Sequence, residues 1–223
     1  GTGNPHVFLS APGKNTGGYL VYGDQLGYDI VGRYVIRPKA LTAFSAGSPN
    51  FTKVYDGTTD VKQYPELTHY TLTGLVTGDS VGLTVTEGTY ADKNAGTGKG
   101  VTFTGLSLTG ADAKNYRLAR DTLTYSAAGT ITKKPLTFGL PEGTVFSKTY
   151  DGTIAFQGDI PSYSLTGFVP GDDAALREDV VRVWFTTENA QGEGEKQNVQ
   201  VENLYLKGAD KNNYTLASSK NLT

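Results

Sequence analysis

The chain has 223 residues, of which 37% are hydrophobic and 29 are glycine, and its formal net charge is −2. Hydrophobic residues and glycine together make up about half of the chain, as in globular proteins, so the composition argues against disorder. The near-neutral charge argues against nucleic acid as a partner, and the absence of Cys excludes disulfides, thiol nucleophiles and iron–sulfur clusters.

The predicted elements are strands throughout the chain. Hydrophobic and polar residues alternate with the two-residue period of a half-buried strand in residues 81–86, 101–108 and 199–206. Gly-Asp, Asp-Gly and Asn-Ala-Gly turn sequences separate these segments. The one candidate helix, residues 172–178, has at most two turns. The sequence therefore predicts an all-β fold.

The sequence repeats itself at an offset close to 95 residues. Four pairs of segments match: 36–42 with 131–137, 51–58 with 146–153, 72–79 with 165–172, and 110–118 with 208–216. The offset changes only where turn residues lie, which is where a β-protein tolerates insertions. Two tandem copies of one domain account for this pattern.

We divide the chain accordingly into residues 1–36, 37–133 and 134–223. The first segment is interpreted as the tail of a preceding repeat, with an N-terminal extension as the alternative, and the last repeat is interpreted as incomplete at its C-terminal end. Because the sequence lacks Met, we expect a processed protein or a fragment of a longer one. No signal peptide is recognised, and no apolar run is long enough for a membrane-spanning helix.

Each repeat has room for six or seven short strands. This number favours tandem immunoglobulin-like β-sandwiches, and a β-grasp-like α+β unit is the alternative. Short linkers that contain Pro38 and Pro135 are expected to join adjacent repeats stiffly, because proline fixes φ.

Four motifs follow one another in residues 53–116: Lys-Val-Tyr-Asp-Gly-Thr-Thr, Leu-Thr-Gly-Leu-Val-Thr-Gly-Asp, Ala-Asp-Lys-Asn-Ala-Gly-Thr-Gly-Lys and Gly-Ala-Asp-Ala-Lys-Asn-Tyr. Together they closely resemble the YDG repeat domain of large bacterial surface proteins, including filamentous-haemagglutinin-like adhesins. The second repeat departs from this pattern between Gly171 and Val201, where other residues replace the Asp-Lys-Asn loop. The resemblance implies a surface context and no catalytic residues.

The Tyr-Asp-Gly motif occurs as Tyr55-Asp56-Gly57 and as Tyr150-Asp151-Gly152. In the first copy, the tyrosine is predicted to be a buried anchor with its hydroxyl at the edge of the core. Aspartate accepts backbone N–H groups in an Asx turn, and glycine supplies a positive φ. The alternative is a sugar site that uses the tyrosine and the carboxylate.

A second turn motif has the form Gly-Ala-Asp-x-x-Asn-Tyr. We predict that it brings the final tyrosine onto a core strand in each repeat. Its members are Asp112, Asn115 and Tyr116 in the first repeat, and Asp210, Asn213 and Tyr214 in the second.

Other chemistry has weaker support in the sequence. Residues 92–100 resemble a phosphate loop but lack its spacing, so we interpret them as a long hairpin loop. His6 and His69 are far apart and do not suggest a metal site. An acidic cluster is a candidate for calcium but lacks the loop pattern; its members are Asp172, Asp173, Glu178 and Asp179.

An internal Lys–Asn isopeptide bond is a further hypothesis, because both repeats carry the three residue types that it needs. These residues are Lys53, Asp79 and Asn115, and Lys148, Asp172 and Asn213. Ordinary surface and turn roles explain the same residues without new chemistry.

The sequence therefore predicts a non-enzymatic, extracellular repeat segment of a bacterial adhesin-like surface protein, secreted or at the cell surface. Its expected role is that of a spacer or stalk, with an adhesion surface for a host or cell-surface glycan or protein as an additional role. Neighbouring repeats of the same chain are the other expected partners. The alternatives are a lectin-like carbohydrate-binding module and an accessory domain of a carbohydrate-active enzyme. No catalytic, metal or cofactor-binding residue is predicted, and nucleic acid binding and membrane spanning are not expected.

Overall fold

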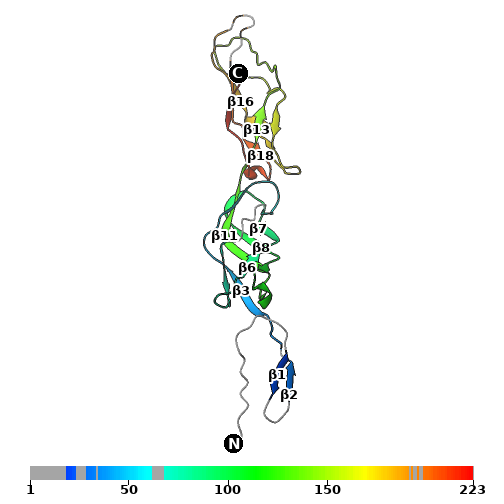
Figure 1. Ribbon diagram of the computed structural model, residues 1–223. Coiled ribbons are helices and arrows are strands. Elements are labelled where there is room, and N and C mark those ends of the chain that lie inside the picture. The colour runs from blue at the N-terminus through cyan, green and yellow to red at the C-terminus, as the bar shows by residue number, and fades with distance from the viewer. Residues whose placement is uncertain are drawn as a thin grey trace. The chain divides into compact units, whose positions relative to one another are not determined.

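The computed structural model describes residues 19–23, 29–33, 35–61, 68–190, 192, 195 and 198–222 (Figure 1). The described part is mostly β, as predicted. Its helical elements are three 3₁₀ turns of three residues each: η1 (Ala113–Asn115), η2 (Glu178–Val180) and η3 (Lys211–Asn213). In this part of the chain, no helix has the length and apolar character that crossing a membrane requires.

The chain forms two compact units that do not coincide with the two sequence repeats. Unit 1 comprises Gly1–Gly47, Glu66–Thr86 and Thr104–Leu123, and unit 2 comprises Ser48–Pro65, Glu87–Phe103 and Thr124–Thr223. Unit 2 therefore joins part of the first repeat to the whole of the second.

Unit 1 contains a hairpin and two small sheets. Strand β1 (Tyr19–Gly23) pairs antiparallel with β2 (Asp29–Arg33). Strand β3 (Lys39–Ser45) lies between β10 (Tyr116–Leu118), which is parallel to it, and β5 (Tyr70–Thr73), which is antiparallel. Strand β6 (Gly82–Thr84) pairs antiparallel with β9 (Ser107–Thr109).

The first-repeat part of unit 2 is built on a four-stranded sheet in the order β4-β11-β8-β7. These strands are β4 (Phe51–Val54), β7 (Glu87–Tyr90), β8 (Gly96–Thr104) and β11 (Thr122–Thr132). Phe51, Phe103 and Tyr125 pack edge to face, with ring centroids 5.1 to 6.0 Å apart. This is a favourable geometry for aromatic pairs, so the cluster stabilises this part of the core.

The second repeat pairs its strands in a similar way. The pairs are β12 (Lys134–Pro135) with β19 (Tyr214–Thr215), β13 (Thr137–Gly139) with β14 (Ser164–Thr166), and β15 (Ala175–Leu176) with β18 (Leu206–Lys207). Strand β17 (Val199–Glu202) lies between β16 (Arg182–Phe185) and β20 (Ser219–Leu222). As β10 runs parallel to β3 in the first repeat, β19 runs parallel to β12 in the second.

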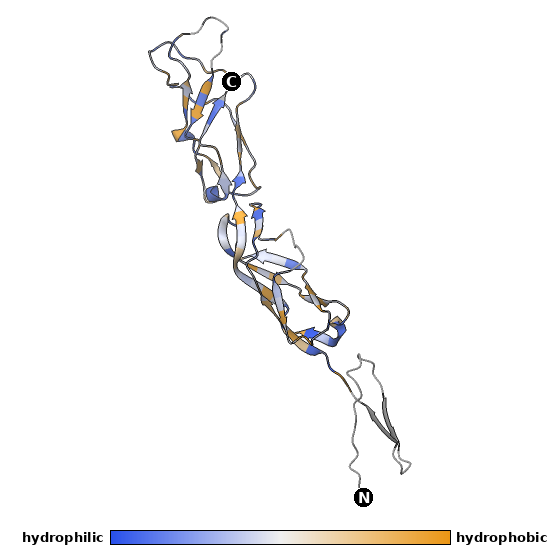
Figure 2. Ribbon diagram, turned by 60° about the vertical axis from the view of Figure 1, so that its left-hand side comes forward, coloured by the Kyte–Doolittle hydropathy of each residue, from blue (hydrophilic) through white to orange (hydrophobic). Residues whose placement is uncertain are grey.

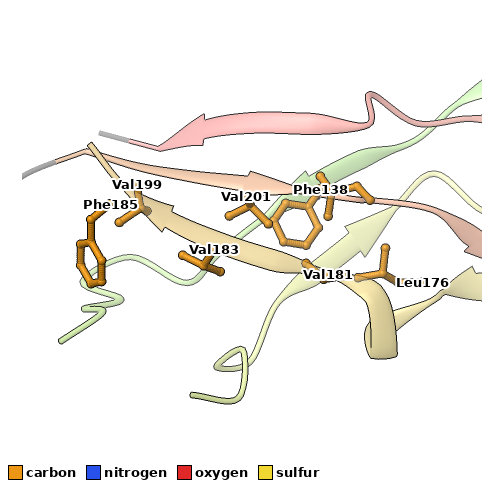
Figure 3. Packing of buried hydrophobic residues seen from close by; sticks show 8 residues of the cluster. Phe138, Leu176, Val181, Val183, Phe185, Val199 and Val201 are labelled. Carbon is orange, nitrogen blue, oxygen red and sulfur yellow. The ribbon is translucent and has the colours of Figure 1, made fainter. Parts of the chain in front are cut away.

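The core of the second repeat follows from the two-residue period of its strands. Val183 and Phe185 on β16 face Val199 and Val201 on β17, with Phe138 packed beside them (Figure 3). The side chains between them are only partly buried or exposed, and hydrophobic and hydrophilic positions alternate along such strands (Figure 2).

Four local predictions are wrong in detail. Residues 172–178 contain strand β15, and only their last residue, Glu178, belongs to a helical element, the 3₁₀ turn η2. The hairpin loop predicted at residues 92–100 is shorter, because strand β8 begins at Gly96. The predicted strand 101–108 is divided between β8 and β9 by Gly105, whose φ is +63°. The predicted strand 199–206 is likewise divided between β17 and β18 by Asn203, whose φ is +60°. The immunoglobulin-like arrangement stays a prediction, as do the repeat boundaries.

Candidate functional site: the junction between the repeats

The Tyr-Asp-Gly turn is held by a lysine that precedes it. Lys53 Nζ donates to Asp56 Oδ1 (2.8 Å) and to the carbonyl oxygen of Thr58 (2.7 Å). Asp56 Oδ1 also accepts the backbone N–H of Thr58 at 3.0 Å, which is the Asx turn expected from the sequence. Gly57 has a φ of +79°. The turn is therefore rigid and locally determined.

The second repeat builds the same turn. Lys148 Nζ donates to Asp151 Oδ1 and to the carbonyl oxygen of Thr153, both at 2.6 Å, and the N–H of Thr153 donates to Asp151 Oδ1 (2.9 Å). The bond from Lys148, followed by those from Thr153, lowers the pKa of Asp151 to about 2. Gly152 has a φ of +71°. The two turns thus have equivalent internal hydrogen bonds.

The second turn motif supplies a tyrosine that meets the aspartate of the Gly-Asp sequence. In the second repeat, the Tyr214 hydroxyl donates to Asp172 Oδ2 (2.5 Å) and accepts the N–H of Val169 (2.9 Å). In the first repeat, the Tyr116 hydroxyl donates to Asp79 Oδ2 (2.5 Å) and accepts the N–H of Val76 (3.0 Å).

The aspartates of this motif tie the turn to the residue that follows the Gly-Asp sequence of the same repeat. Asp112 Oδ2 accepts the N–H of Ser80 (2.9 Å), and Asp210 Oδ2 accepts the N–H of Asp173 (3.0 Å). Tyr116 and Tyr214 are both buried, as expected for residues brought onto core strands. Asn213 is 3% exposed, whereas Asn115 is only partly buried.

Within unit 2, the tyrosine of the first repeat's turn meets the aspartate of the second repeat. The Tyr55 hydroxyl donates to Asp172 Oδ2 at 2.7 Å, so two tyrosines from different repeats share one carboxylate oxygen. The ring of Tyr55 packs edge to face on that of Tyr214 with centroids 5.5 Å apart, and Phe168 packs on the same ring at 5.2 Å. Tyr55 is 1% exposed. We call this contact region between the repeats the junction.

The Asp-Lys-Asn loop of the first repeat also belongs to the junction. The N–H of Ala95 donates to Asn213 Oδ1 (2.8 Å), and Asn213 Nδ2 donates to Asn94 Oδ1 (3.3 Å). Lys93 Nζ lies 3.7 Å from Asp172 Oδ1. A buried carboxamide satisfied on both of its polar ends specifies one orientation of the two repeats.

A glycine allows the close approach at the centre of the junction. A Cβ placed on Gly57 would lie 2.8 Å from Val169 Cγ1, closer than real contacts allow. A Cβ on the equivalent Gly152 would meet no atom within 4 Å. The same turn is therefore packed in the first repeat and open in the second.

The electrostatics of the junction favour a charged aspartate and neutral tyrosines. Burial acts to raise the pKa of Asp172, but hydrogen bonds from Tyr214 and Tyr55 and the nearby Lys93 outweigh it, and the pKa is lowered. Burial, followed by the hydrogen bond to Asp172, raises the pKa of Tyr214 to about 12. The same causes raise the pKa of Tyr55.

These shifts predict alkaline destabilisation of unit 2. Because the folded pKa values of Tyr55 and Tyr214 lie above the ordinary tyrosine value of about 10, the unfolded chain releases these protons first as the pH rises. The stabilisation is complete below pH of about 10 and is lost as the pH rises through the folded values. The midpoint of urea unfolding should fall between pH 9 and pH 11, and by less in Tyr55→Phe. An equal fall in the parent protein and in Tyr55→Phe would contradict a contribution of the Tyr55 hydroxyl.

The structure brings only some of the predicted motif residues together. Tyr55, Gly57, Asn213 and Tyr214 lie in the junction, and Asp56 and Asp210 shape the turns beside it. Asp112, Asn115 and Tyr116 lie in unit 1. Asp151 and Gly152 form their turn away from any such contact, and Tyr150 is 63% exposed, unlike its equivalent Tyr55.

Three other residues have structural roles that the sequence does not predict. The sequence suggests only calcium or the crosslink for Asp172 and only the crosslink for Lys53, and it suggests no role for Lys93. A signal for Asp172 is the repetition of its Gly-Asp sequence at Asp79, in repeats that both end in the same tyrosine turn.

The acidic cluster proposed for calcium is dispersed among separate partners. Asp172 binds two tyrosines, Asp173 Oδ2 accepts the N–H of Ala209, Asp179 contacts Arg177, and Glu178 accepts the hydroxyl of Tyr163. Among the described residues, no group of three or more His, Asp or Glu side chains is placed to hold a metal ion.

The other candidate sites have structural partners as well. Lys99, in the segment with a superficial resemblance to a phosphate loop, donates to Asp92 at 2.6 Å. The lysine and asparagine proposed for a crosslink in the second repeat bind elsewhere, Lys148 in its own turn and Asn213 to the loop at Asn94. In the first repeat, Lys53 likewise binds within its own turn.

Comparison with known proteins identifies the family. Residues 37–124 and residues 132–221 each match the YDG domain. The chain therefore belongs to the YDG domain family and contains two copies of that domain. No curated protein and no solved structure matches the chain.

Proposed function

We propose that this chain is a non-enzymatic spacer segment of an adhesin-like bacterial surface protein, in which successive YDG domains are fixed to one another by side-chain contacts. The observation that carries the proposal is the junction, where Tyr55 of one domain and Tyr214 of the next share Asp172 Oδ2. A buried, fully hydrogen-bonded contact resists bending better than a flexible linker does, and stiffness is what a spacer needs.

The surface location rests on a separate argument. The four motifs resemble repeats of large bacterial surface proteins. A chain without Cys is also compatible with the oxidising environment outside the cell. Secretion or attachment to the cell surface, with neighbouring repeats of the same chain as partners, is part of the proposal on this ground.

The placement of the aromatic residues bears on the lectin alternative. Clustered exposed aromatics would favour sugar binding, whereas tyrosines buried at equivalent positions would favour the spacer. The equivalent residues Tyr116 and Tyr214 are both buried. In the other equivalent pair, Tyr55 is buried and Tyr150 is exposed. The hydroxyl and ring of Tyr55 are engaged by the second repeat, so this Tyr-Asp pair does not present a sugar site. An additional adhesion surface for a glycan or protein stays part of the proposal.

Stiffness of the junction can be measured directly, since the chain has no Cys of its own. Spin labels at Thr52→Cys and Lys207→Cys, both at exposed positions, report on the first and second repeats within unit 2. We expect a narrow distribution of label distances by pulsed electron paramagnetic resonance, and a clear broadening when Asp172→Ala is added. The matched variant Asp79→Ala removes the equivalent carboxylate of the first repeat and should leave the distribution narrow. A broad distribution in the labelled parent protein would refute the spacer proposal.

A further inference from the structure

Each YDG domain carries two faces that fit each other. We define the donor face as the Tyr-Asp-Gly turn, represented by Tyr55 and Gly57 in the first domain and by Tyr150 and Gly152 in the second. The acceptor face is the group of residues that receives this turn. Its members are Phe168, Val169, Asp172 and Tyr214 in the second domain, and Leu75, Val76, Asp79 and Tyr116 at the same motif positions of the first.

One donor face and one acceptor face occupy each other at the junction. In the part of the chain that the structure describes, no such partner covers the other two faces, which we call open. On the open donor face, Tyr150 is 63% exposed and Gly152 has free space around it. On the open acceptor face, Leu75 and Val76 are 37% and 49% exposed. Large apolar side chains at these levels of exposure, next to a tyrosine–aspartate pair, mark a surface suited to binding.

Both open faces already have the internal geometry of the occupied ones. The donor turn at Tyr150 is held by Lys148, Asp151 and Thr153 with the same contacts that hold the turn at Tyr55. On the acceptor face, Asp79 accepts the Tyr116 hydroxyl as Asp172 accepts that of Tyr214. Binding therefore requires little ordering of either face, which lowers its entropic cost.

We propose that the open donor face of one copy of this chain binds the open acceptor face of a second copy, head to tail. The Tyr150 hydroxyl donates to Asp79, which then accepts two tyrosines as Asp172 does. Val76 takes the place of Val169 against the glycine of the turn, and Leu75 takes the place of Phe168. The inference depends on the contacts of the junction and not on the spacer role.

The contact between copies is weaker than the junction within the chain. The second domain departs from the family pattern where the first has its Asp-Lys-Asn loop, so the contacts of Lys93 and Asn94 have no recognised counterpart. Two separate chains also lack the high effective concentration that a short linker gives. Measurements must therefore extend to chain concentrations of about 1 mM.

Sedimentation and NMR relaxation of the full chain between micromolar and millimolar concentration test the proposal. We expect concentration-dependent association that Tyr150→Ala and Val76→Asp each remove. Both positions are exposed, so the variants should keep the folded stability of the parent chain. The matched controls Tyr205→Ala and Val35→Asp change residues that are exposed to a similar or greater extent elsewhere and should associate like the parent.

Mixing the two variants gives the sharper result. Tyr150→Ala keeps an intact acceptor face, and Val76→Asp keeps an intact donor face, so the mixture should form one-to-one pairs and nothing larger. A parent chain that stays monomeric at all concentrations would overturn the inference. So would association that persists in both variants. None of these outcomes alters the stiffness measurement within one chain, so the spacer proposal is tested separately.

Discussion

Replacing Asp172 by alanine is expected to lower the free energy of unfolding of unit 2 by about 3 kcal/mol, because two buried tyrosine hydroxyls lose their acceptor together. A buried donor left without a partner costs about 1–3 kcal/mol, and Lys93 also loses its counter-charge. Urea unfolding followed by fluorescence and circular dichroism measures the change.

The control for this variant is Asp79→Ala. Asp79 accepts the hydroxyl of Tyr116, which belongs to the same repeat. At micromolar concentration, the free energy of unfolding should fall about half as much in this variant, by about 1–2 kcal/mol. Equal losses in the two variants would mean that the hydroxyl of Tyr55 contributes nothing, and the junction would then lose its central contact.

Gly57→Ala is expected to destabilise the chain by about 2–4 kcal/mol, whereas Gly152→Ala costs only about 1–2 kcal/mol. Both glycines have a positive φ, +79° and +71°, so both variants incur the same backbone strain. Only at Gly57 does the added methyl group meet Val169, at 2.8 Å. The difference between the two variants therefore isolates packing at the junction.

The same unfolding measurements decide this prediction. If Gly152→Ala lowers the free energy of unfolding as much as Gly57→Ala does, backbone strain accounts for both losses. The contact with Val169 would then contribute nothing to the difference. A pair of variants at equivalent positions cancels the errors that affect a single substitution.

The sequence was sufficient for features that depend on neighbouring residues. Alternation of residue types predicted the strands, and Asp-Gly predicted the Asx turn at Asp56, because these features require only a few consecutive residues. The same local sequence forms the same turn at Asp151. The candidate helical segment at residues 172–178 was wrong for the opposite reason. Ala175 and Leu176 have helical preferences, but pairing of β15 with β18 and burial of Leu176 override them.

The candidate site was harder to predict because identical motifs have different surroundings. Tyr55 and Tyr150 lie in the same Lys-x-Tyr-Asp-Gly-Thr sequence and in equivalent turns, yet one is buried and the other is exposed. What differs is the presence of an acceptor face from another domain, and no local pattern encodes that. The pairing of Asp172 with a tyrosine 42 residues later is likewise a property of the tertiary fold.

That sequence separation also determines when the contact between the domains can form. The donor turn is assembled from residues within five positions of each other. The acceptor pair forms only when the second domain has brought together residues 42 positions apart. The contact between Tyr55 and Asp172 therefore exists only when both domains are folded, and melting either domain removes this stabilisation from the other. In a nearest-neighbour description of an array, such an interface energy makes adjacent domains fold cooperatively, whichever of them folds first.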